Sequence, residues 1–316
     1  MADLTAIILT YNEELHIERC LAALKLVCSR IVVVDSFSND RTVELVRAKN
    51  VELLQHVFVN QADQFQWALD NAGITSSWVM RLDADEVFDA ELAEEITETI
   101  ASLPPDVTGI CLKRRQYFLG EFVRYGGRYP LILLRIWRNG CGRVEQRWMD
   151  EHIVLDHGEI VTLKHDFRDD SLRNVAWWSE KHIRYATREA VDVLIRRHRL
   201  FESGDGLGSQ HGSAQARQRR AFKEGFYNRL PFLLGPVLYF LYRFIILGGF
   251  LDGKGGRAYH VLQGFWYRVL VDVRVLELDR ILNDCPDVAS RIKALERETK
   301  LPVREFAAKS TVRSVA

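Results

Sequence analysis

The chain has 316 residues, of which 47% are hydrophobic and 27% charged, so it can bury the core of one large or two smaller domains. Its 43 lysines and arginines balance 43 aspartates and glutamates, and this neutral total gives no support for nucleic-acid binding. The five scattered cysteines include no C-x-x-C pair, which indicates neither a disulfide framework nor a zinc knuckle and favours reduced thiols in the cytosol.

The first hundred residues alternate between apolar runs and helical patterns. Buried strands are predicted at 4–9, 30–36, 51–57 and 78–83, and helices at 13–27, 39–49, 60–72 and 90–103. This order, with its short connections, predicts an open parallel sheet with helices on both faces. Asn39 or Asp40 is expected to cap the second helix. The start of the chain lacks the pattern of a signal peptide, so we expect the protein on the cytoplasmic side.

Polar and acidic residues follow several of these strands. Ligands of such sheets bind at the carboxyl ends of the strands, where these residues should gather. They are Thr10, Tyr11, Asn12, Glu13, Asp35, Ser36, Asp83, Ala84, Asp85 and Glu86. The chain contains neither a G-x-G-x-x-G turn after the first strand nor a P-loop motif. A nucleotide would therefore be bound by side chains and a metal ion.

The segment "WVMRLDADEVF" (78–88) ends a predicted strand with several charges. On an extended backbone Arg81, Asp83 and Asp85 point to one side. Two such carboxylates suit Mg²⁺ or Mn²⁺, which accepts substrate phosphates as further ligands, and Arg81 could balance diphosphate charge. The alternative is that Asp83 or Asp85 caps the helix that begins at 90.

The rest of the chain changes character. Strands are expected at 107–123, 131–139 and 160–167, an amphipathic helix at 171–201, and a loop at 203–215. Basic residues at 196–199, 216–220 and 229 precede an apolar stretch, 230–251, whose only charge is Arg243. Its prolines and glycines argue against one straight spanning helix. With 258–278 it predicts a helical hairpin in or on a membrane, the alternative being a buried helix pair or dimer interface.

Four motifs together resemble the family 2 inverting glycosyltransferases of the GT-A fold: "AIILTYNEE", "VVVDSFSNDRT", "RLDADE" and "RWMDEH". The resemblance covers residues 4 to about 200, and the segment "GFLDGKGGRAYHVLQGFWYRVLVD" resembles a bacterial subset acting in lipopolysaccharide core, capsule and exopolysaccharide synthesis. The resemblance implies an α/β, Rossmann-like GT-A sheet in residues 1–202. The rest of the chain is expected to form a basic linker or helix in 203–229, the membrane-associated hairpin in 230–278, and a tail in 279–316.

The resemblance also implies roles for the residues at the strand ends. Thr10, Tyr11 and Glu13 would line the nucleotide pocket, and Asp35 would read the base, with uracil favoured. Asp83 would contact the ribose or sugar and Asp85 would bind the metal, with His165 as a possible further ligand. The other residues expected to bind the nucleotide sugar are Asn12, Ser36, Gln64, Arg81 and Ala84.

An inverting transfer needs a base that removes the proton of the acceptor hydroxyl. Asp150 in "RWMDEH" matches the family position for this base, Glu151 is its rival, and pairing of Asp150 with Arg143 or Arg147 is the structural alternative.

The expected function is the transfer of one sugar from a nucleotide-diphosphate sugar, a UDP-sugar being favoured, to a lipid-linked glycan acceptor. The site of action would be the cytoplasmic face of the bacterial inner membrane, with the protein peripheral or monotopic. Gln146-Arg147-Trp148 lacks the Q-x-x-R-W spacing of processive synthases, which favours single addition. The alternatives are a non-catalytic membrane-associated scaffold of the same fold, and a sugar nucleotidyltransferase, which would need a glycine-rich loop after the first strand.

Overall fold

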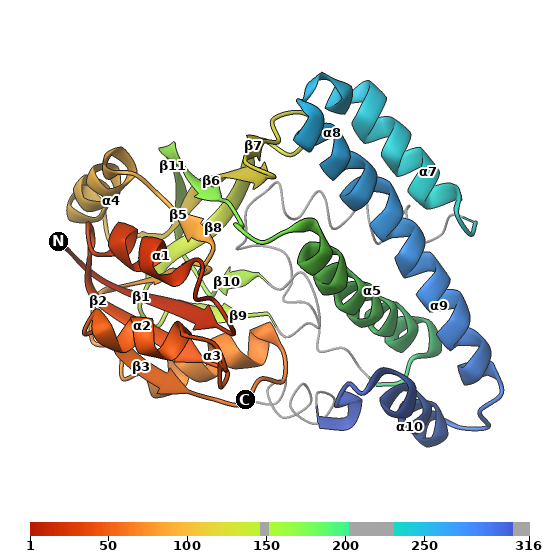
Figure 1. The fold of residues 1–316 in the computed structure, drawn as a ribbon. Coiled ribbons are helices and arrows are strands. Elements are labelled where there is room, and N and C mark those ends of the chain that lie inside the picture. The colour runs from red at the N-terminus through yellow and green to blue at the C-terminus, as the bar shows by residue number, and fades with distance from the viewer. Residues whose placement is uncertain (146–151, 202–230, 306–316) are drawn as a thin grey trace.

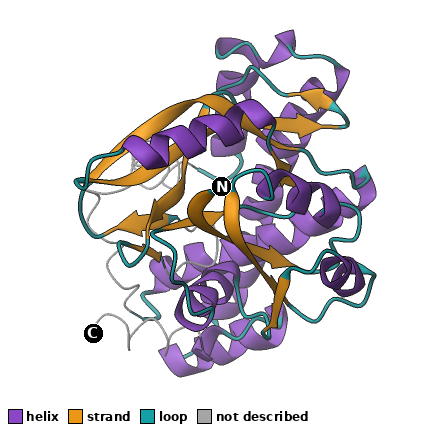
Figure 2. Cartoon of the chain, turned by 90° about the vertical axis from the view of Figure 1, so that its left-hand side faces the viewer, coloured by secondary structure: helices purple, strands orange, loops and turns teal. Residues whose placement is uncertain are grey.

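The structure is a computed structural model that describes residues 1–145, 152–201 and 231–305. An α/β half built by the first part of the chain faces a layer of long helices built by the second part (Figure 1). Seen from the side of the α/β half, helices lie on both sides of a curled sheet (Figure 2).

The predicted alternation of strands and helices is confirmed in the first hundred residues. The elements are β1 (Ala2–Thr10), α1 (Ile17–Leu24), β2 (Cys28–Asp35), α2 (Thr42–Ala48), β3 (Glu52–Gln55), α3 (Gln61–Asn71), β4 (Trp78–Arg81) and α4 (Ala90–Ser102). Asn60 caps α3 by accepting the N–H of Asp63 at 2.8 Å. The cap expected for α2 is wrong, because Arg41 occupies that position, although Asp40 accepts the N–H of Thr42 at 2.9 Å.

The four strands of the first hundred residues pair in parallel, as predicted, and later strands make the complete sheet mixed. Its order is β3-β2-β1-β4-β8-β6-β11-β5, in which β8 (Leu131–Arg138) runs antiparallel to both β4 and β6 (Val107–Phe118). Because β8 is antiparallel to both neighbours, β6 runs in the same direction as β4, and β11 (Glu159–Asp169) is parallel to β6. The carboxyl ends of β6 and β11 therefore lie at the edge where β1, β2 and β4 end. Shorter strands are β5 (Glu86–Val87), β7 (Glu121–Phe122) and an unpredicted pair, β9 (Gly142–Val144) with β10 (Ile153–Leu155).

Both faces of the sheet are covered by apolar side chains, as continuous apolar strands require. Ile8 packs with Leu21 of α1 and Leu92 of α4 on one face, and all three are at most 1% exposed. Its neighbour Ile7 points to the other face and packs with Phe65 of α3. Helices therefore cover both faces of the sheet, while its carboxyl edge remains available for ligands.

The second half of the chain is helical. Its elements are α5 (Val175–His198), α7 (Leu234–Leu241), the π-helical η2 (Tyr242–Ile246), η3 (Gly249–Leu251), α8 (Lys254–Val261), the π-helical η4 (Leu262–Trp266), α9 (Tyr267–Asn283) and α10 (Val288–Thr299). One apolar core joins α5, α9 and α10 through Leu194, Leu278 and Leu295. The predicted domain boundary at 278/279 falls inside α9. None of the helices in the described ranges combines the length and apolar character that crossing a membrane requires.

Candidate active site

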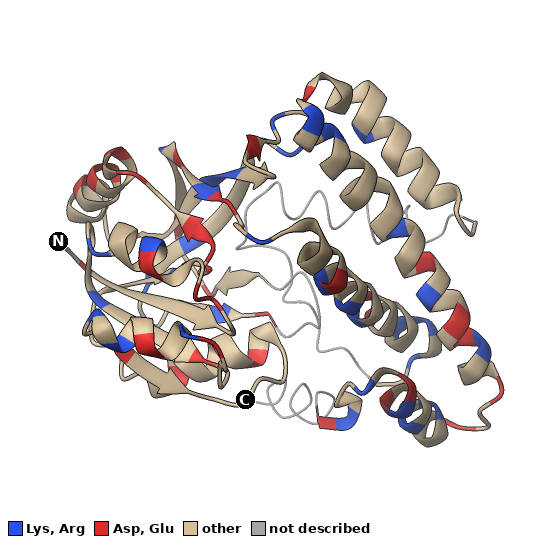
Figure 3. Ribbon diagram, in the orientation of Figure 1, with Lys and Arg blue, Asp and Glu red and all other residues tan. Residues whose placement is uncertain are grey.

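A cleft of about 340 Å³ lies between the carboxyl edge of the sheet and the helical layer. The sheet contributes Asp83, Asp85, Arg114 and Asp169 to one wall. Charged residues of both signs are visible where this edge faces the helices (Figure 3). The opposite wall consists of side chains from α5, α8, η4 and α9, namely Trp177, Trp178, Lys181, His182, Tyr185, Glu189, Tyr259, Gln263, Tyr267 and Arg268.

The acidic segment after β4 forms a turn, whereas an extended strand was expected. The strand ends at Arg81, and the N–H of Glu86 donates to the carbonyl of Asp83 at 2.9 Å. Asp83 and Asp85 nevertheless both line the cleft, while Ala84 between them is buried in the core. The helix-cap alternative for the two aspartates is excluded, because Asp89 caps α4 by accepting the N–H of Leu92 at 3.3 Å.

Asp83 is held by two arginines. Its carboxylate lies 3.7 Å from Nε of Arg81 and 3.8 Å from Nη2 of Arg135. Burial acts against the charged form, but these two cations, together with Lys181 and Arg114, outweigh it and keep the pKa of Asp83 below its usual value. Arg81 itself is buried and lies over the ring of Phe65. Its positive charge is already balanced by the carboxylate of Asp83.

Glu86 supports Asp83 from behind. It is 1% exposed, pairs with Arg135, and accepts the N–H of Asp83 at 2.9 Å. Burial raises the pKa of Glu86 to about 8, and the neighbouring Asp83 and Asp169 act in the same direction. Glu86 is thus a positioning residue that fixes the backbone of the acidic turn.

Asp85 offers the free carboxylate of the site. Its carbonyl is fixed by the side chain of Arg19 at 3.3 Å and by the N–H of Asp170 at 3.2 Å. Its carboxylate accepts no hydrogen bond from the described residues, and it lines the cleft beside Asp83. Mg²⁺ is commonly bound by one or two carboxylates together with substrate phosphates and water, so Asp85 with Asp83 fits this ion. No group of three His, Cys, Asp or Glu in the described ranges could hold a metal by itself.

His165 does not join this acidic pair. Its Nδ1 lies 2.8 Å from Glu95 Oε2 of α4, and its backbone N–H donates to the same oxygen at 2.9 Å. The chain hydrogen-bonds to the Asp85 backbone at Asp170, five residues further on, which corresponds to about 16 Å of extended chain. The expectation that His165 shares a metal with Asp85 is therefore wrong.

Asp35 lies below the surface of the site. It is 0% exposed, and it accepts hydrogen bonds from Thr10 Oγ1 at 3.0 Å, from the N–H of Ser38 at 2.9 Å and from Gln55 at 3.3 Å. In this arrangement the carboxylate ties β1 to the loop after β2. Its contact with a base stays a prediction.

Gln64 also turns inward. Its amide donates to Ser36 Oγ at 3.1 Å, and its Oε1 lies 2.9 Å from Nδ1 of His56. The side chain is 0% exposed, so its contact with a donor stays a prediction, as for Asp35. Gln64 instead fixes the position of Ser36 after β2.

The segment after β1 combines an exposed ring with a fixed backbone. Tyr11 is 57% exposed and can stack on a flat ligand. Asn12 has a φ of 58°, and its Oδ1 accepts the N–H of Asn39 at 2.9 Å. The side chain of Asn12 therefore fastens this segment to the loop after β2, so it is already engaged within the protein.

Glu13 is linked to the chain just before α5. His16 Nε2 accepts the N–H of Leu172 at 2.9 Å, so its proton lies on Nδ1 and is donated to Glu13, 2.6 Å away. Because His16 is 1% exposed, this bridge is shielded from water. It holds the end of β1 against the start of the helical half.

The two candidates for the base, Asp150 and Glu151, lie outside the described residues. The N–H of Glu145 donates to the carbonyl of His152 at 2.9 Å, so the two described ends of this segment lie side by side next to β9 and β10. His152 itself lies 4.0 Å from Glu145.

Sequence reasoning missed the contribution of α5. Lys181 lies in the cleft, with its ammonium 5.0 Å from the ring centre of Trp177 and 5.5 Å from that of Tyr185. Burial alone would lower its pKa, but Tyr185, Asp85 and Glu13 raise it above the usual lysine value. The spacing of Trp177, Lys181 and Tyr185 at every fourth residue places them on one helix face and was the available signal.

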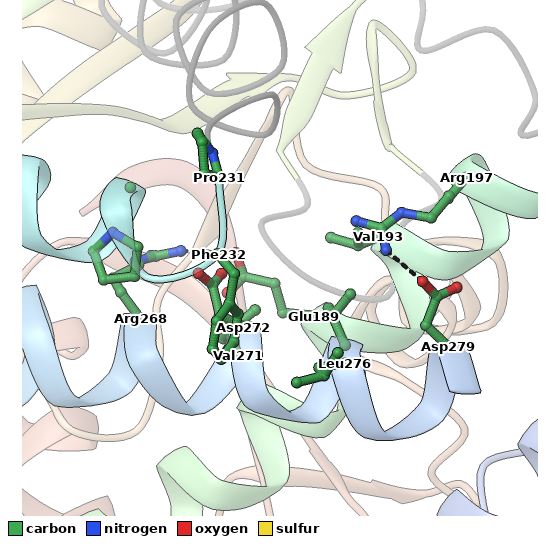
Figure 4. Close-up of a pocket in the computed structure, with 13 residues that line it drawn as sticks. Glu189, Val193, Arg197, Pro231, Phe232, Arg268, Val271, Asp272, Leu276 and Asp279 are labelled. Carbon is green, nitrogen blue, oxygen red and sulfur yellow. Dashed lines mark hydrogen bonds and ion pairs between the residues drawn. The ribbon is translucent and has the colours of Figure 1, made fainter. Parts of the chain in front are cut away.

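A second cavity, of about 180 Å³, lies between α5, α7 and α9 (Figure 4). Glu189 borders both cavities and is fixed by Tyr267 at 2.6 Å and Arg268 at 2.8 Å. The ion pair of Arg197 with Asp279 closes its other end at 2.8 Å. Because no residue of the sheet lines it, this cavity is separate from the acidic strand ends.

Comparison with known sequences gives matches in the α/β half. Residues 5–170 match the family described as "Glycosyl transferase family 2". The lipopolysaccharide core biosynthesis glycosyltransferase LpsC of Rhizobium meliloti is 31% identical over 162 residues, which cover 50% of this chain and 58% of LpsC. An uncharacterized glycosyltransferase of Rickettsia typhi is 29% identical over 102 residues, covering 32% of this chain and 34% of that protein. The chain thus spans less than two thirds of these relatives.

Comparison with solved structures matches TarS 1–349 of S. aureus in complex with UDP-GlcNAc. It is 15% identical, has a TM-score of 0.43, and the match covers 87% of this chain and 89% of TarS 1–349. The mannosyltransferase PcManGT of Pyrobaculum calidifontis, in complex with GDP-Man and Mn²⁺, is 14% identical with a TM-score of 0.40, covering 99% of this chain and 87% of PcManGT.

Proposed function

The chain belongs to glycosyl transferase family 2, and from this premise we propose that it transfers a single sugar from a nucleotide-diphosphate sugar to a glycan acceptor. The observation that supports this most is the cleft in which the free carboxylate of Asp85, with Asp83 beside it, faces Lys181 across the carboxyl edge of the sheet. A UDP-sugar is the favoured donor. Tyr11 would stack on the base, and Thr10 and Glu13 would border the nucleotide.

The leaving group of this transfer is a nucleoside diphosphate, so negative charge must be stabilised where it departs. Asp85, assisted by Asp83, would hold Mg²⁺ or Mn²⁺, which when bound supplies Lewis-acid stabilisation of the diphosphate. The contribution of the chain is to hold the two carboxylates in position. Arg81 and Arg135 do this for Asp83, and Arg19 fixes the backbone of Asp85.

Inversion at the anomeric carbon requires a base on the face of the sugar opposite the diphosphate. We assign this role to Asp150, with Glu151 as the alternative. The base would take the proton of the acceptor hydroxyl as its oxygen attacks the anomeric carbon and the bond to the diphosphate breaks.

The acceptor we propose is a lipid-linked glycan of bacterial surface polysaccharide synthesis, handled at the cytoplasmic face of the inner membrane. The named role of the relative LpsC in lipopolysaccharide core biosynthesis supports the pathway class. An exposed apolar face on α7 and η2 supports contact with a membrane, with the enzyme peripheral or monotopic. Its side chains are Leu234, Val237, Leu238, Leu241, Tyr242, Ile245 and Ile246.

The test is a donor screen on the purified protein, comparing Asp85→Asn with Asp150→Asn. We expect Asp85→Asn to abolish turnover and the effect of added Mn²⁺ on donor binding. Asp150→Asn should bind the donor nearly as tightly as the wild type and lose at least about a hundredfold in transfer. Asp106→Asn, at an exposed site away from the cleft, is the matched control.

Two results would contradict the proposal in different ways. If the wild type binds no sugar nucleotide with any divalent cation or with a chelator, the proposed activity is wrong. If both variants lose donor binding equally, the division of roles between Asp85 and Asp150 is wrong.

A further inference from the structure

The charges of the cleft are unevenly paired. Arg114 pairs with Asp169 at 3.0 Å, and Arg268 pairs with Glu189 at 2.8 Å. Among the described residues no carboxylate lies within ion-pair distance of the Lys181 ammonium, although it lines the same cleft. The cleft therefore presents a lysine whose charge is available to a ligand.

Lys181 is held in place by rings, which leaves its ammonium hydrogens free. The ammonium lies over Trp177 at 5.0 Å and near Tyr185 at 5.5 Å, and both rings belong to its own helix face. Such contacts stabilise a cation without using its N–H donors. The three donors of the ammonium can then all serve an anion.

The surroundings of Lys181 come from several strand ends. The acids that act on it electrostatically include Glu13 after β1, Asp83 and Asp85 after β4, and Asp169 at the end of β11. Lys181 and Asp85 line the same cleft at the carboxyl edge of the sheet. A diphosphate whose sugar end lies near Asp85 would therefore lie in this cleft beside the ammonium.

We propose that Lys181 binds the diphosphate of the donor directly, so that the helical half of the molecule completes the donor site. The proposal rests on the proposed function and extends it to a residue of α5. One divalent cation at Asp85 leaves part of the diphosphate charge unbalanced, and the ammonium supplies the missing cation on the other side. Lys181 would then also stabilise the departing nucleoside diphosphate.

The competing explanation is structural: Lys181 merely relieves repulsion among the surrounding acids. The two roles differ in their dependence on phosphate. A lysine that contacts the diphosphate affects UDP binding and leaves uridine binding unchanged, whereas a structural lysine affects both together with folding stability.

The experiment measures binding of UDP and of uridine by calorimetry, with Mn²⁺ present, in the full chain. We expect Lys181→Met to weaken UDP binding about ten- to hundredfold, because one charge-assisted contact is lost. Uridine binding should stay within about twofold of the wild type. Lys181→Arg should recover part of the loss. The affinity for UDP should also fall less steeply with added salt in Lys181→Met than in the wild type. Lys164→Met, an exposed lysine of β11, is the control.

Equal weakening of UDP and uridine in Lys181→Met, or unchanged UDP affinity, would overturn the proposal for Lys181. Absence of UDP binding by the wild type, tested in parallel with GDP, would instead overturn the proposed function. The two failures are therefore distinguishable.

Discussion

Asp252 joins the helical hairpin to the strands through a single carboxylate. Its side chain is 2% exposed and accepts the backbone N–H groups of Arg124 at 3.0 Å and Tyr125 at 3.2 Å. It also accepts Nε2–H of His260 at 2.8 Å. One acidic residue in the turn between η3 and α8 thereby satisfies donors from the β7 region and from α8.

Replacing Asp252 by alanine should destabilise the protein by about 3 kcal/mol, because buried N–H groups and the imidazole lose their acceptor. Asp252→Asn, which keeps one oxygen, should cost less. Urea unfolding measures both, with the exposed Asp284→Ala as control. A loss for Asp252→Ala no larger than the control would show that the turn is not anchored here.

For single residues, the sequence predicted which side chains lie at the strand ends better than it predicted which side chains contact each other. Asp83 and Asp85 were found because they follow a buried strand, and strand ends meet at one edge of the sheet. His165 was misassigned because it makes hydrogen bonds to Glu95, a contact that no local pattern reveals. The internal hydrogen bond of Gln64 to His56 was equally hidden in the sequence. Lys181 was missed because its approach to Asp85 depends on how α5 folds back.

At the scale of elements, the apolar face of α7 and η2 is the feature without a partner in the described structure. Leu238, Leu241 and Ile245 are 43%, 41% and 54% exposed and follow each other at helical spacing. Exposed apolar patches of this kind mark interaction surfaces, and basic residues at 196–199 precede it in the chain. The occupant we propose is an anionic lipid surface.

Changing Leu238, Leu241 and Ile245 together to glutamine should lower co-sedimentation with anionic phosphatidylglycerol vesicles about tenfold or more. Each side chain loses on the order of 1 kcal/mol of burial in the membrane interface. The control replaces Leu26, Val57 and Val288, which are 52%, 66% and 41% exposed elsewhere. The proposal is wrong if the two triple variants co-sediment with vesicles to the same extent. If the first variant also alters self-association, the apolar face is a contact between copies of the chain.

The order of the elements was predictable where the hydrophobic periodicity is strong and involves residues close together in the sequence. The alternation up to α4 follows from apolar runs and helical spacing alone. The antiparallel β8 between β4 and β6, and the short pair of β9 and β10, required knowledge of long-range pairing. The hairpin was expected from its apolar content, but the π-helical segments η2 and η4 within it have no sequence signal.

At the scale of the whole molecule, two neutral histidines lie among the contacts of the helical layer. His182 of α5 stacks on Trp178 at 3.5 Å, donates from Nδ1 to the carbonyl of Trp178 at 2.8 Å, and meets the ring of Tyr267 of α9. Burial lowers the pKa of His182 to about 4 and also lowers the pKa of His260. Both rings are therefore uncharged in the folded protein near neutral pH.

This depression of the two pKa values predicts acid-sensitive packing of the helical layer. The unfolded chain binds more protons than the folded one below about pH 6.5, so stability is fully present above that pH and is lost as pH falls toward about 4. His182→Gln should lower the melting temperature at about pH 7.5 through lost stacking, yet its melting temperature should fall less between about pH 6.5 and 4.5 than that of the wild type. The exposed His157→Gln should follow the wild type. A fall in His182→Gln as steep as in the wild type would mean that carboxylates alone, such as those at the sheet edge, govern the response to acid.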